Sequence, residues 1–435
     1  MTAQLFVLLG DHAVGRLTRD DASSLTFEYD EAWLEDESAY PLSISMPLAR
    51  ARHSGDVVEA YLWGLLPDNE IILDGWAKRF KVSARNPFAL LAHVGEDCPG
   101  AVRFFTPSLR DKVAREHEKR REIAWLDEHA IAERLRALHR DASAWREATD
   151  TGQFSLGGAQ PKTALFSDGK RWGVPSGRVP TTHILKPGSP DLEGHAENEH
   201  FCLVLAGEAG LPVARSQVMR FEDEVAIVVE RYDRLRDADA VLRVHQEDCC
   251  QALGVLPVNK YENVGGPGAR AIATLLRERS RSAQEDVDTF LGALAFNWIV
   301  AGTDAHAKNY SVLIGRGGEL RLAPLYDIAS FLPYAKHGLR KLTLAMKIGG
   351  TYRLHDIGVH AWQKLASEVG RDPEEERAKI AAMCEALPDL CAEVHERTKG
   401  DGLAHRGLAV LTAKIQERAR ACGRVLRSVA YAAER

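Results

Sequence analysis

The sequence has few of the features that mark several large classes of protein. Its 56 Lys and Arg against 62 Asp and Glu give a formal charge of -6, so no basic surface for nucleic acid is predicted. Its seven cysteines are odd in number and lack paired CxxC spacing, which favours neither a disulfide framework nor a zinc ribbon. The longest apolar run, 290–302, contains Asn297 and is shorter than the roughly 18 residues of a membrane helix.

The first residues, "MTAQLFVLLGDHAVGRLTRD", lack the basic start of a secretory signal and have the pattern of strand, turn and strand. With no membrane segment and no disulfide pattern, we expect a cytoplasmic protein in a reducing compartment. A composition of 45% hydrophobic and 27% charged residues is typical of a globular chain.

A chain of 435 residues has room for about two to three domains. The pattern predicts a small α+β domain over 1–107 and a charged helical connector over 108–150. A β-rich region follows over 151–254 and a mainly helical one over 255–435. The connector is predicted from apolar residues near helical spacing, which are Trp125, Leu126, Ile131, Leu135 and Leu138.

The β-rich region opens with a glycine pair, in "QFSLGGAQPKTALFSDGKRWGVP". Gly157 and Gly158 precede a predicted strand, so they lie in a loop at the start of a sheet. Glycines let backbone amides approach phosphate oxygens, and Lys162 could add positive charge. Taken alone, two such glycines are more often ordinary turn residues, because the stretch is neither a Walker A motif nor the usual kinase GxGxxG.

Further charged residues follow at the ends of predicted elements. Lys186 ends the strand in "TTHILKPG", and Glu199 lies on the apolar stripe of the next helix; such a pair grips ATP in protein kinases. The buried strand Val225 to Val229 then runs into Glu230, Tyr232 and Asp233, the position of the nucleotide hinge in a kinase. Each charge taken singly is more often a solvated surface group.

The stretch "TDAHAKNYSVLI" places a polar loop between a predicted helix over 284–302 and a strand over 310–314. Asp304 and Asn309 have the D-x-x-x-x-N separation of the base and metal ligand in the protein-kinase catalytic loop. Asp327 follows a predicted hairpin, where kinases place a second metal-binding acid. His306 could join Asp304 at a zinc site, but a third ligand is missing, so a role in loop geometry is favoured.

Together these stretches resemble the HipA family of serine/threonine kinases, the toxins of bacterial HipBA toxin-antitoxin modules. The resemblance implies an α+β, protein-kinase-like, two-lobed fold, with a mainly β N-lobe, an all-helical C-lobe and an N-terminal α+β subdomain. The stretches that carry it, in the family's order, are "PLSISMPL", "LLPDN", "GAVRF", "SLGGAQPKTAL", "THILKPG", "ENEHFCLVLAGE", "VERYDR", "VHQEDCCQALG", "KYENVGGPG", "GTDAHAKNYSV" and "PLYDIAS".

The resemblance also implies roles for individual residues. Asp304 matches the catalytic base, Lys186 the ATP-phosphate lysine, and Asn309 and Asp327 the Mg2+ ligands. Ser155 matches an autophosphorylated serine whose phosphate switches the kinase off. The segment 260–268 matches a mobile activation segment. The residues expected to contact ATP are Ser155, Gly157, Gly158, Ala159, Gln160, Lys162, Lys186, Glu230, Tyr232, Asp233, His306, Lys308 and Asp327.

The family's partners are implied in the same way. A HipB-like helix-turn-helix antitoxin would hold the kinase inactive and connect it to operator DNA, and an aminoacyl-tRNA synthetase, first of all glutamyl-tRNA synthetase, would be the substrate. Pro161, where some relatives have an acid, and the pair Cys249 and Cys250 leave the substrate open. Two alternatives remain: a weakly active module that acts mainly as corepressor with the antitoxin, and a small-molecule kinase of the aminoglycoside phosphotransferase type.

Overall fold

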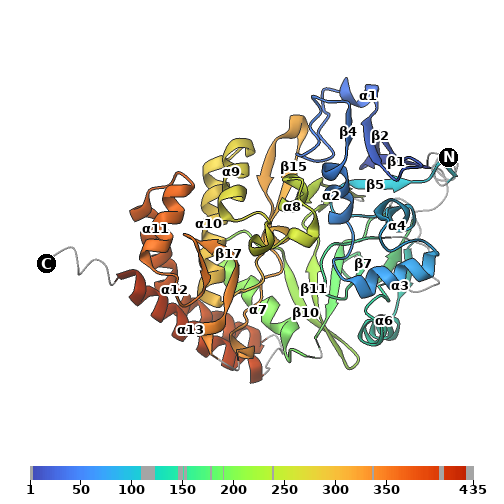
Figure 1. The fold of residues 1–435 in the computed structure, drawn as a ribbon. Coiled ribbons are helices and arrows are strands. Elements are labelled where there is room, and N and C mark those ends of the chain that lie inside the picture. The colour runs from blue at the N-terminus through green and yellow to red at the C-terminus, as the bar shows by residue number, and fades with distance from the viewer. Residues whose placement is uncertain are drawn as a thin grey trace. The chain divides into compact units, whose positions relative to one another are not determined.

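The computed structural model describes residues 3–108, 123–145, 150, 154–176, 179–189, 191–237, 240–335, 338–400 and 406–427 (Figure 1). By its internal contacts the chain divides into two compact units. Unit 1 comprises 1–187, 219–259 and 311–320, and unit 2 comprises 188–218, 260–310 and 321–435. Each unit therefore combines segments that are distant in the sequence.

Unit 1 begins with an antiparallel sheet in the order β4-β3-β2-β1-β5. The alternation in β1 places Leu5, Val7 and Leu9 in the core, as expected for a sheet with one buried face. The predicted strand, turn and strand at the N-terminus is confirmed by β1 and β2. The elements are β1 (Ala3–Leu9), β2 (His12–Arg19), β3 (Leu25–Tyr29), α1 (Glu31–Leu34), β4 (Arg52–Ser54), α2 (Asp56–Gly64), α3 (Glu70–Phe80), α4 (Pro87–Val94) and β5 (Val102–Phe105).

A second sheet has the order β10-β11-β9-β7-β8-β6. Its central strands are buried on both faces, since Ala226 to Val229 of β11 are all in the core and helix α6 contacts β9 and β11. The elements are β6 (Ile123–Leu126), α6 (Glu128–Arg140), β7 (Thr163–Ser167), β8 (Trp172–Pro175), β9 (His183–Pro187), β10 (Ser216–Phe221) and β11 (Glu224–Glu230).

The predicted connector helix over 108–150 is only partly correct. Ile131, Leu135 and Leu138 form the buried face of α6, as the helical spacing predicts. Trp125 and Leu126, however, belong to strand β6, which pairs with β8 from Leu126↔Trp172 to Ile123↔Pro175. The pairing with β8 decides the conformation of this short segment. The helical spacing of its apolar residues does not. The parts of the connector at 109–122 and 146–149 lie outside the described residues.

A smaller sheet, β14-β15-β16, and the hairpin β12-β13 complete the strands around the second sheet. The stretch "VHQEDCCQALG" docks onto the N-terminal subdomain: the side chain of His245 contacts the carbonyl oxygen of Leu42, and Glu247 accepts a hydrogen bond from the amide of Ile44. Gln251 donates to the carbonyl of Tyr61. The elements are β12 (Arg234–Asp237), β13 (Ala240–Arg243), β14 (Gln246–Asp248), α8 (Cys249–Ala252), β15 (Ser311–Ile314) and β16 (Leu320–Leu322).

Unit 2 is mainly helical, and α12 and α13 pack along each other (Figure 1). Within region 255–435, which the pattern predicts to be mainly helical, the hairpin β17-β18 adds strands that the sequence pattern does not indicate. Predicted helix 284–302 is confirmed by α10. The elements are α7 (His195–Glu208), α9 (Ala269–Arg279), α10 (Ala283–Val300), β17 (Thr343–Ile348), β18 (Thr351–Arg353), α11 (Val359–Glu368), α12 (Pro373–Gly400) and α13 (Arg406–Arg427).

The fold also bears on the cysteines and on membrane-spanning helices. All seven cysteines are buried, and none of them forms a disulfide, as the missing CxxC pairs predict. In the described part of the chain, no helix combines the length and the apolar character that crossing a membrane requires.

Candidate active site

The glycine loop of unit 1 precedes strand β7 and needs glycine at one position. Gly158 has φ +94, a backbone region that other residues rarely adopt, and a Cβ there would lie 2.8 Å from Nζ of Lys162. Lys162 donates a hydrogen bond to the carbonyl oxygen of Gly157 at 2.7 Å, and its ammonium lies 5.2 Å from the ring centroid of Trp145. The lysine therefore braces the loop, and its contact with phosphate stays a prediction.

The segment Leu65 to Asn69 of the N-terminal subdomain holds this loop from outside. Pro67 and Gly158 form a parallel β-bridge, and the amide of Asp68 donates to the Gly158 carbonyl at 3.2 Å. The side-chain amide of Asn69 donates to the carbonyl of Ala159 at 3.3 Å. The side-chain oxygen of Asn69 caps α3 by accepting from the amide of Ile71. One asparagine thus joins a helix start to the glycine loop.

Ser155 is buried in this arrangement, with 0% of its surface exposed. Its hydroxyl donates to the carbonyl oxygen of Leu65 at 2.7 Å, and its amide donates to the carbonyl of Asp97. A phosphate adds three acceptor oxygens and about two negative charges. Because the Ser155 side chain is fully buried, there is no room for this group here. Phosphorylation of Ser155 would require the loop to leave this position.

Lys186 lies on β9, where it pairs with Ile227 of β11, and only 8% of it is exposed. Gln160 of the glycine loop donates to the carbonyl of the next residue, Pro187, at 3.5 Å. The loop and the predicted ATP lysine therefore lie on adjoining segments of unit 1. Glu199, on α7 of unit 2, is 1% exposed, as predicted from its helical stripe. Its ion pair with Lys186 stays a prediction.

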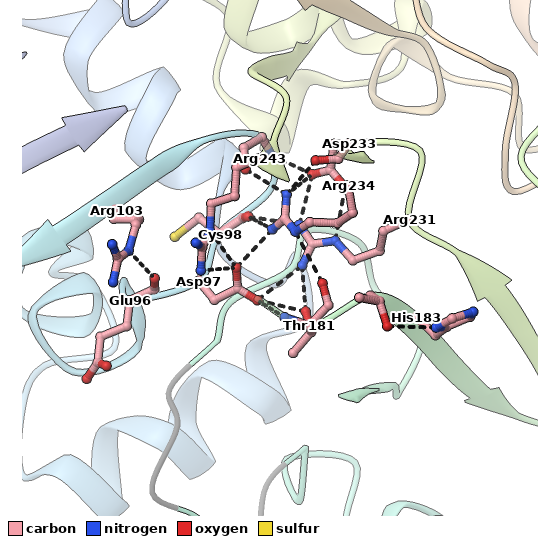
Figure 2. Close-up of polar contacts among 12 residues, drawn as sticks. Glu96, Asp97, Cys98, Arg103, Thr181, His183, Arg231, Asp233, Arg234 and Arg243 are labelled. Atoms are coloured by element: carbon pink, nitrogen blue, oxygen red, sulfur yellow. Dashed lines mark hydrogen bonds and ion pairs between the residues drawn. The ribbon is translucent and has the colours of Figure 1, made fainter. Parts of the chain in front are cut away.

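The hinge residues after β11 take part in a buried ion network that the sequence did not indicate (Figure 2). Asp233 accepts hydrogen bonds from the Arg231 guanidinium at 3.0 and 2.9 Å and from the amide of Gly100 at 2.6 Å. Arg234 lies 3.0 Å from the same carboxylate. Both oxygens of Asp233 are engaged, so this geometry does not support the prediction that Asp233 contacts ATP. Tyr232 donates to the side-chain oxygen of Gln246 at 2.8 Å.

Asp97 supplies the second carboxylate of the network from the N-terminal subdomain. Its oxygens face Arg234 at 2.9 Å, Arg243 at 3.2 Å and Arg231 at 3.4 Å (Figure 2). Burial alone would raise the pKa of Asp97, but the three guanidinium groups outweigh it and hold the pKa well below its usual range. Because two carboxylates face three buried arginines, Asp97 is essential for neutralising the positive charge of the guanidinium groups. No local spacing in the sequence could have indicated this, because Asp97 and Arg234 are 137 residues apart.

The catalytic loop of unit 2 starts where α10 ends. Ala301 ends the helix with a positive φ of 53, and the amide of Gly302 donates to the carbonyl of Asn297 at 2.8 Å. A Cβ on Gly302 would lie 2.1 Å from the side-chain oxygen of Asn297, so only glycine fits. The helix end therefore fixes the start of the predicted D-x-x-x-x-N segment.

Within this loop the predicted residues are held by each other. The side-chain amide of Asn309 donates to the Asp304 carbonyl at 2.9 Å, and the amide of His306 donates to the same oxygen at 2.8 Å. The bond from Asn309 uses the nitrogen of its side-chain amide and not the oxygen. Asp304 is exposed, whereas His306, Lys308 and Asn309 are buried. An exposed carboxylate on a fixed loop is suited to receive a proton.

Asp327 lies on a segment attached to this loop. The hydroxyl of Tyr326 donates to the carbonyl of Lys308 at 2.7 Å, and Leu325 forms a parallel bridge with Val213. Asp327 has φ +58, an uncommon conformation for a residue other than glycine that recurs at functional sites. Asp304, Asn309 and Asp327 are thus placed by the same unit on connected segments.

These three residues fit magnesium better than zinc. Magnesium prefers oxygen ligands and usually takes one or two carboxylates together with phosphates and water. Asp327 and Asn309 offer a carboxylate and an amide oxygen. Among the described residues, no group of three or more His, Cys, Asp or Glu side chains could hold a metal by itself, so the zinc alternative with His306 finds no support.

One residue beside the catalytic loop escaped the sequence prediction of site residues. Tyr261, in the predicted activation segment, donates its hydroxyl to Oδ1 of Asp304 at 2.6 Å. Its ring packs edge-on against His306, with the ring centroids 5.0 Å apart. The stretch "KYENVGGPG" identifies the activation segment in the sequence. No local pattern, however, predicts the contact between Tyr261 and Asp304, which are 43 residues apart.

The chain is similar to known proteins along most of its length. A family model described as the HipA-like C-terminal domain matches residues 154–391, and one described as the HipA N-terminal domain matches residues 5–105. The putative kinase Y4mE of Sinorhizobium fredii is 37% identical over 88% of this chain and 90% of that protein. The serine/threonine-protein kinase toxin HipA of Shewanella oneidensis is 28% identical over 90% of this chain and 89% of that protein.

The fold matches a solved structure as well. It is similar to a chain of the Shewanella oneidensis toxin-antitoxin complex of HipA, HipB and operator DNA, with a TM-score of 0.83. The match covers 98% of this chain and 99% of that one at 24% sequence identity. The predicted kinase-like α+β fold with an N-terminal subdomain is confirmed by this match.

Proposed function

Because the chain belongs to the HipA family of serine/threonine kinase toxins, we propose that it transfers the γ-phosphate of ATP to serine or threonine hydroxyls of a protein, with Asp304 as the base. The observation that carries the assignment of the base is the catalytic loop, where an exposed Asp304 is held by hydrogen bonds from Asn309 and His306. Asp304 receives the acceptor proton, the acceptor oxygen bonds to the γ-phosphorus, and ADP leaves.

Asn309 and Asp327 are the residues that would hold Mg2+. When bound, the metal neutralises charge on the transferring phosphoryl group. The bond from the Asn309 amide to the Asp304 carbonyl keeps the amide oxygen available, and the fixed backbone at Asp327 holds its carboxylate on the same set of segments. The catalytic loop and the segment of Asp327 thereby orient the two proposed metal ligands relative to the base, and no third acidic ligand is proposed.

The glycine loop and Lys186 would bind the ATP phosphates. The loop is already braced by Lys162, Asp68 and Asn69, which reduces the entropy lost when a nucleotide binds. Lys186 is almost buried on β9, where water screens its charge little. Ala159 and Gln160 belong to the same loop, and Glu230 and Tyr232 are proposed to face the adenine.

Autophosphorylation of Ser155 is proposed as the off-switch. The buried hydroxyl must first leave its bond to the Leu65 carbonyl, so phosphorylation and the braced loop exclude each other. Once phosphorylated, Ser155 could not return, because burying a phosphate without cationic partners is costly. The phosphate would therefore trap the loop away from the position that binds ATP.

The partners are proposed from the same family. A HipB-like antitoxin would bind this chain and connect it to operator DNA, which suits a formal charge of -6 that predicts no basic surface for DNA. The proposed substrate is an aminoacyl-tRNA synthetase, with glutamyl-tRNA synthetase tested first, and its phosphorylation would inhibit translation.

The test is mass spectrometry of phosphosites after the full chain is incubated with Mg-ATP and a bacterial extract. We expect a phosphopeptide from a synthetase and phosphate on Ser155, both absent with Asp304→Asn. Purified glutamyl-tRNA synthetase added alone separates direct transfer from transfer by another kinase. Nucleotide binding without any phosphopeptide would contradict the proposal and favour the corepressor role.

A further inference from the structure

The hydroxyl next to the catalytic base in this structure comes from the protein's own activation segment. Tyr261 donates to Oδ1 of Asp304 at 2.6 Å, within the range of a strong bond between a hydroxyl and a carboxylate. In phosphoryl transfer, the base accepts this same bond from the hydroxyl of the substrate. A tyrosine hydroxyl and an acceptor serine or threonine hydroxyl that approaches Oδ1 therefore compete for one carboxylate oxygen.

Other contacts hold Tyr261 in this place. The amide of Ala307 donates to the carbonyl of Lys260 at 3.2 Å, which ties the activation segment to the catalytic loop by backbone. The tyrosine ring packs edge-on against His306. The carbonyl of Tyr261 accepts from the amides of Val264 and Gly266, at 3.2 and 3.0 Å. The side chain is thus anchored on both its hydroxyl and its backbone.

The segment that carries Tyr261 is built so that it can open at low cost. The short helical turns 257–259 and 262–264 bury no side chain, and Val258 and Val264 are 76% and 53% exposed. Few buried apolar contacts mean that local opening costs little free energy. Gly265, with φ +91, provides backbone freedom beside the turn. Glu262 fastens the far side through the amide of Lys347.

We propose that Tyr261 is a built-in competitor for the acceptor position, which a protein substrate must displace before its hydroxyl reaches Asp304. Tyr261 thereby selects for substrates that bind the activation segment as well as the base. A hydroxyl delivered without such contacts must still displace the Tyr261 hydroxyl from Asp304, so it is phosphorylated less efficiently. This inference rests on the proposed role of Asp304 as the base.

The test compares Tyr261→Phe with the wild-type full chain. The variant keeps the ring that packs on His306 and removes the hydroxyl that donates to Asp304. With dephosphorylated casein as a general serine and threonine acceptor, we expect kcat/KM for casein to rise about fivefold, with an unchanged KM for ATP. Tyr352→Phe makes the same exchange on β18 and should change neither value. A fall in kcat for Tyr261→Phe would show that the hydroxyl orients the base, and an unchanged kcat/KM would show no competition; both results overturn the proposal.

Hydrogen exchange of the amides at 260–266 tests the contact without catalysis. Tyr261→Phe should exchange several-fold faster there than the wild type, and equal rates would overturn the proposal. If Asp304→Asn keeps full transfer activity, or if no variant transfers phosphate, the proposed function fails instead. The exchange rates still decide in that case whether the hydroxyl holds the segment.

Discussion

The glycine loop and the catalytic loop are both short polar segments, but the protein holds them in different ways. The glycine loop is fixed by contacts from residues 65–69 of the N-terminal subdomain, about 90 residues earlier in the chain. The catalytic loop is fixed mainly by bonds among its own residues, 304–309, and by the end of α10. Nucleotide binding should therefore depend on the N-terminal subdomain, and proton transfer should not.

The largest expected effect breaks the catalytic loop alone. Asp304→Asn should lower kcat about 100- to 10,000-fold, because the amide cannot take the acceptor proton. The thermal midpoint and the KM for ATP should stay close to the wild type, since Asp304 is exposed. Steady-state phosphate transfer measures the effect, and Asp288→Asn in the same unit serves as the control. Retained activity would show that another group is the base.

The next effect breaks the joint between the N-terminal subdomain and the hinge. Asp97→Asn leaves Arg231, Arg234 and Arg243 buried with a single remaining carboxylate, and should lower the free energy of unfolding by about 3–5 kcal/mol. Urea denaturation measures this loss. Asp168→Asn removes an exposed ion pair with Arg171 and should have a much smaller effect. Equal effects of the two variants would refute the role of the network.

A pH-dependent effect tests a second contact of the N-terminal subdomain, between Ile44 and Glu247. Burial raises the pKa of Glu247 to about 8, so the folded chain keeps this carboxyl protonated while the unfolded chain ionises it near its ordinary pKa. Between about pH 4.5 and 8 the folded state binds more protons, so its stability falls as pH rises. Glu247→Gln keeps an acceptor for the Ile44 amide and should raise the free energy of unfolding by roughly 3 kcal/mol at pH 8 and much less at pH 5.

Denaturation at both pH values measures the effect of Glu247→Gln. Glu28→Gln, on an exposed position of β3, is the control and should behave like the wild type at both values. A gain of equal size at pH 5 and pH 8 would show that Glu247 does not ionise in this window.

The smallest effect loosens the glycine loop from outside. Asn69→Ser keeps a side-chain oxygen to cap α3 but cannot reach the Ala159 carbonyl. The loss of one hydrogen bond should raise the KM for ATP about fivefold with little change in kcat. Asn86→Ser makes the same exchange at the start of α4 and is the matched control. If kcat falls instead of KM rising, Asn69 acts on the chemistry and not on the loop.

The sequence predicted those parts of the site that depend on local spacing. The helix 284–302, the strand after it and the separation of Asp304 from Asn309 are short-range patterns, and the structure has them as α10, β15 and one hydrogen-bonded loop. The roles of these residues in catalysis stay predictions. The kinase-like fold followed from a resemblance spread along the chain.

The remaining features depend on contacts between distant residues, which one sequence does not reveal. The pairing of β6 with β8 overrides the helical spacing of Trp125 and Leu126. Asp97 and Asp233 bind the arginines after β11, so Asp233 has structural partners at a position where an ATP contact was predicted. The bond from Tyr261 to Asp304 likewise requires the fold of unit 2.

The most direct test of this division is a calorimetric titration of Mg-ATP into the wild type, Asn69→Ser and Asp304→Asn. We predict that Asn69→Ser weakens binding about fivefold while Asp304→Asn binds like the wild type. If Asn69→Ser bound as tightly as the wild type, the glycine loop would not depend on the N-terminal subdomain in the way proposed. If Asp304→Asn lost binding, nucleotide binding would also depend on the catalytic loop, which would contradict the proposed division.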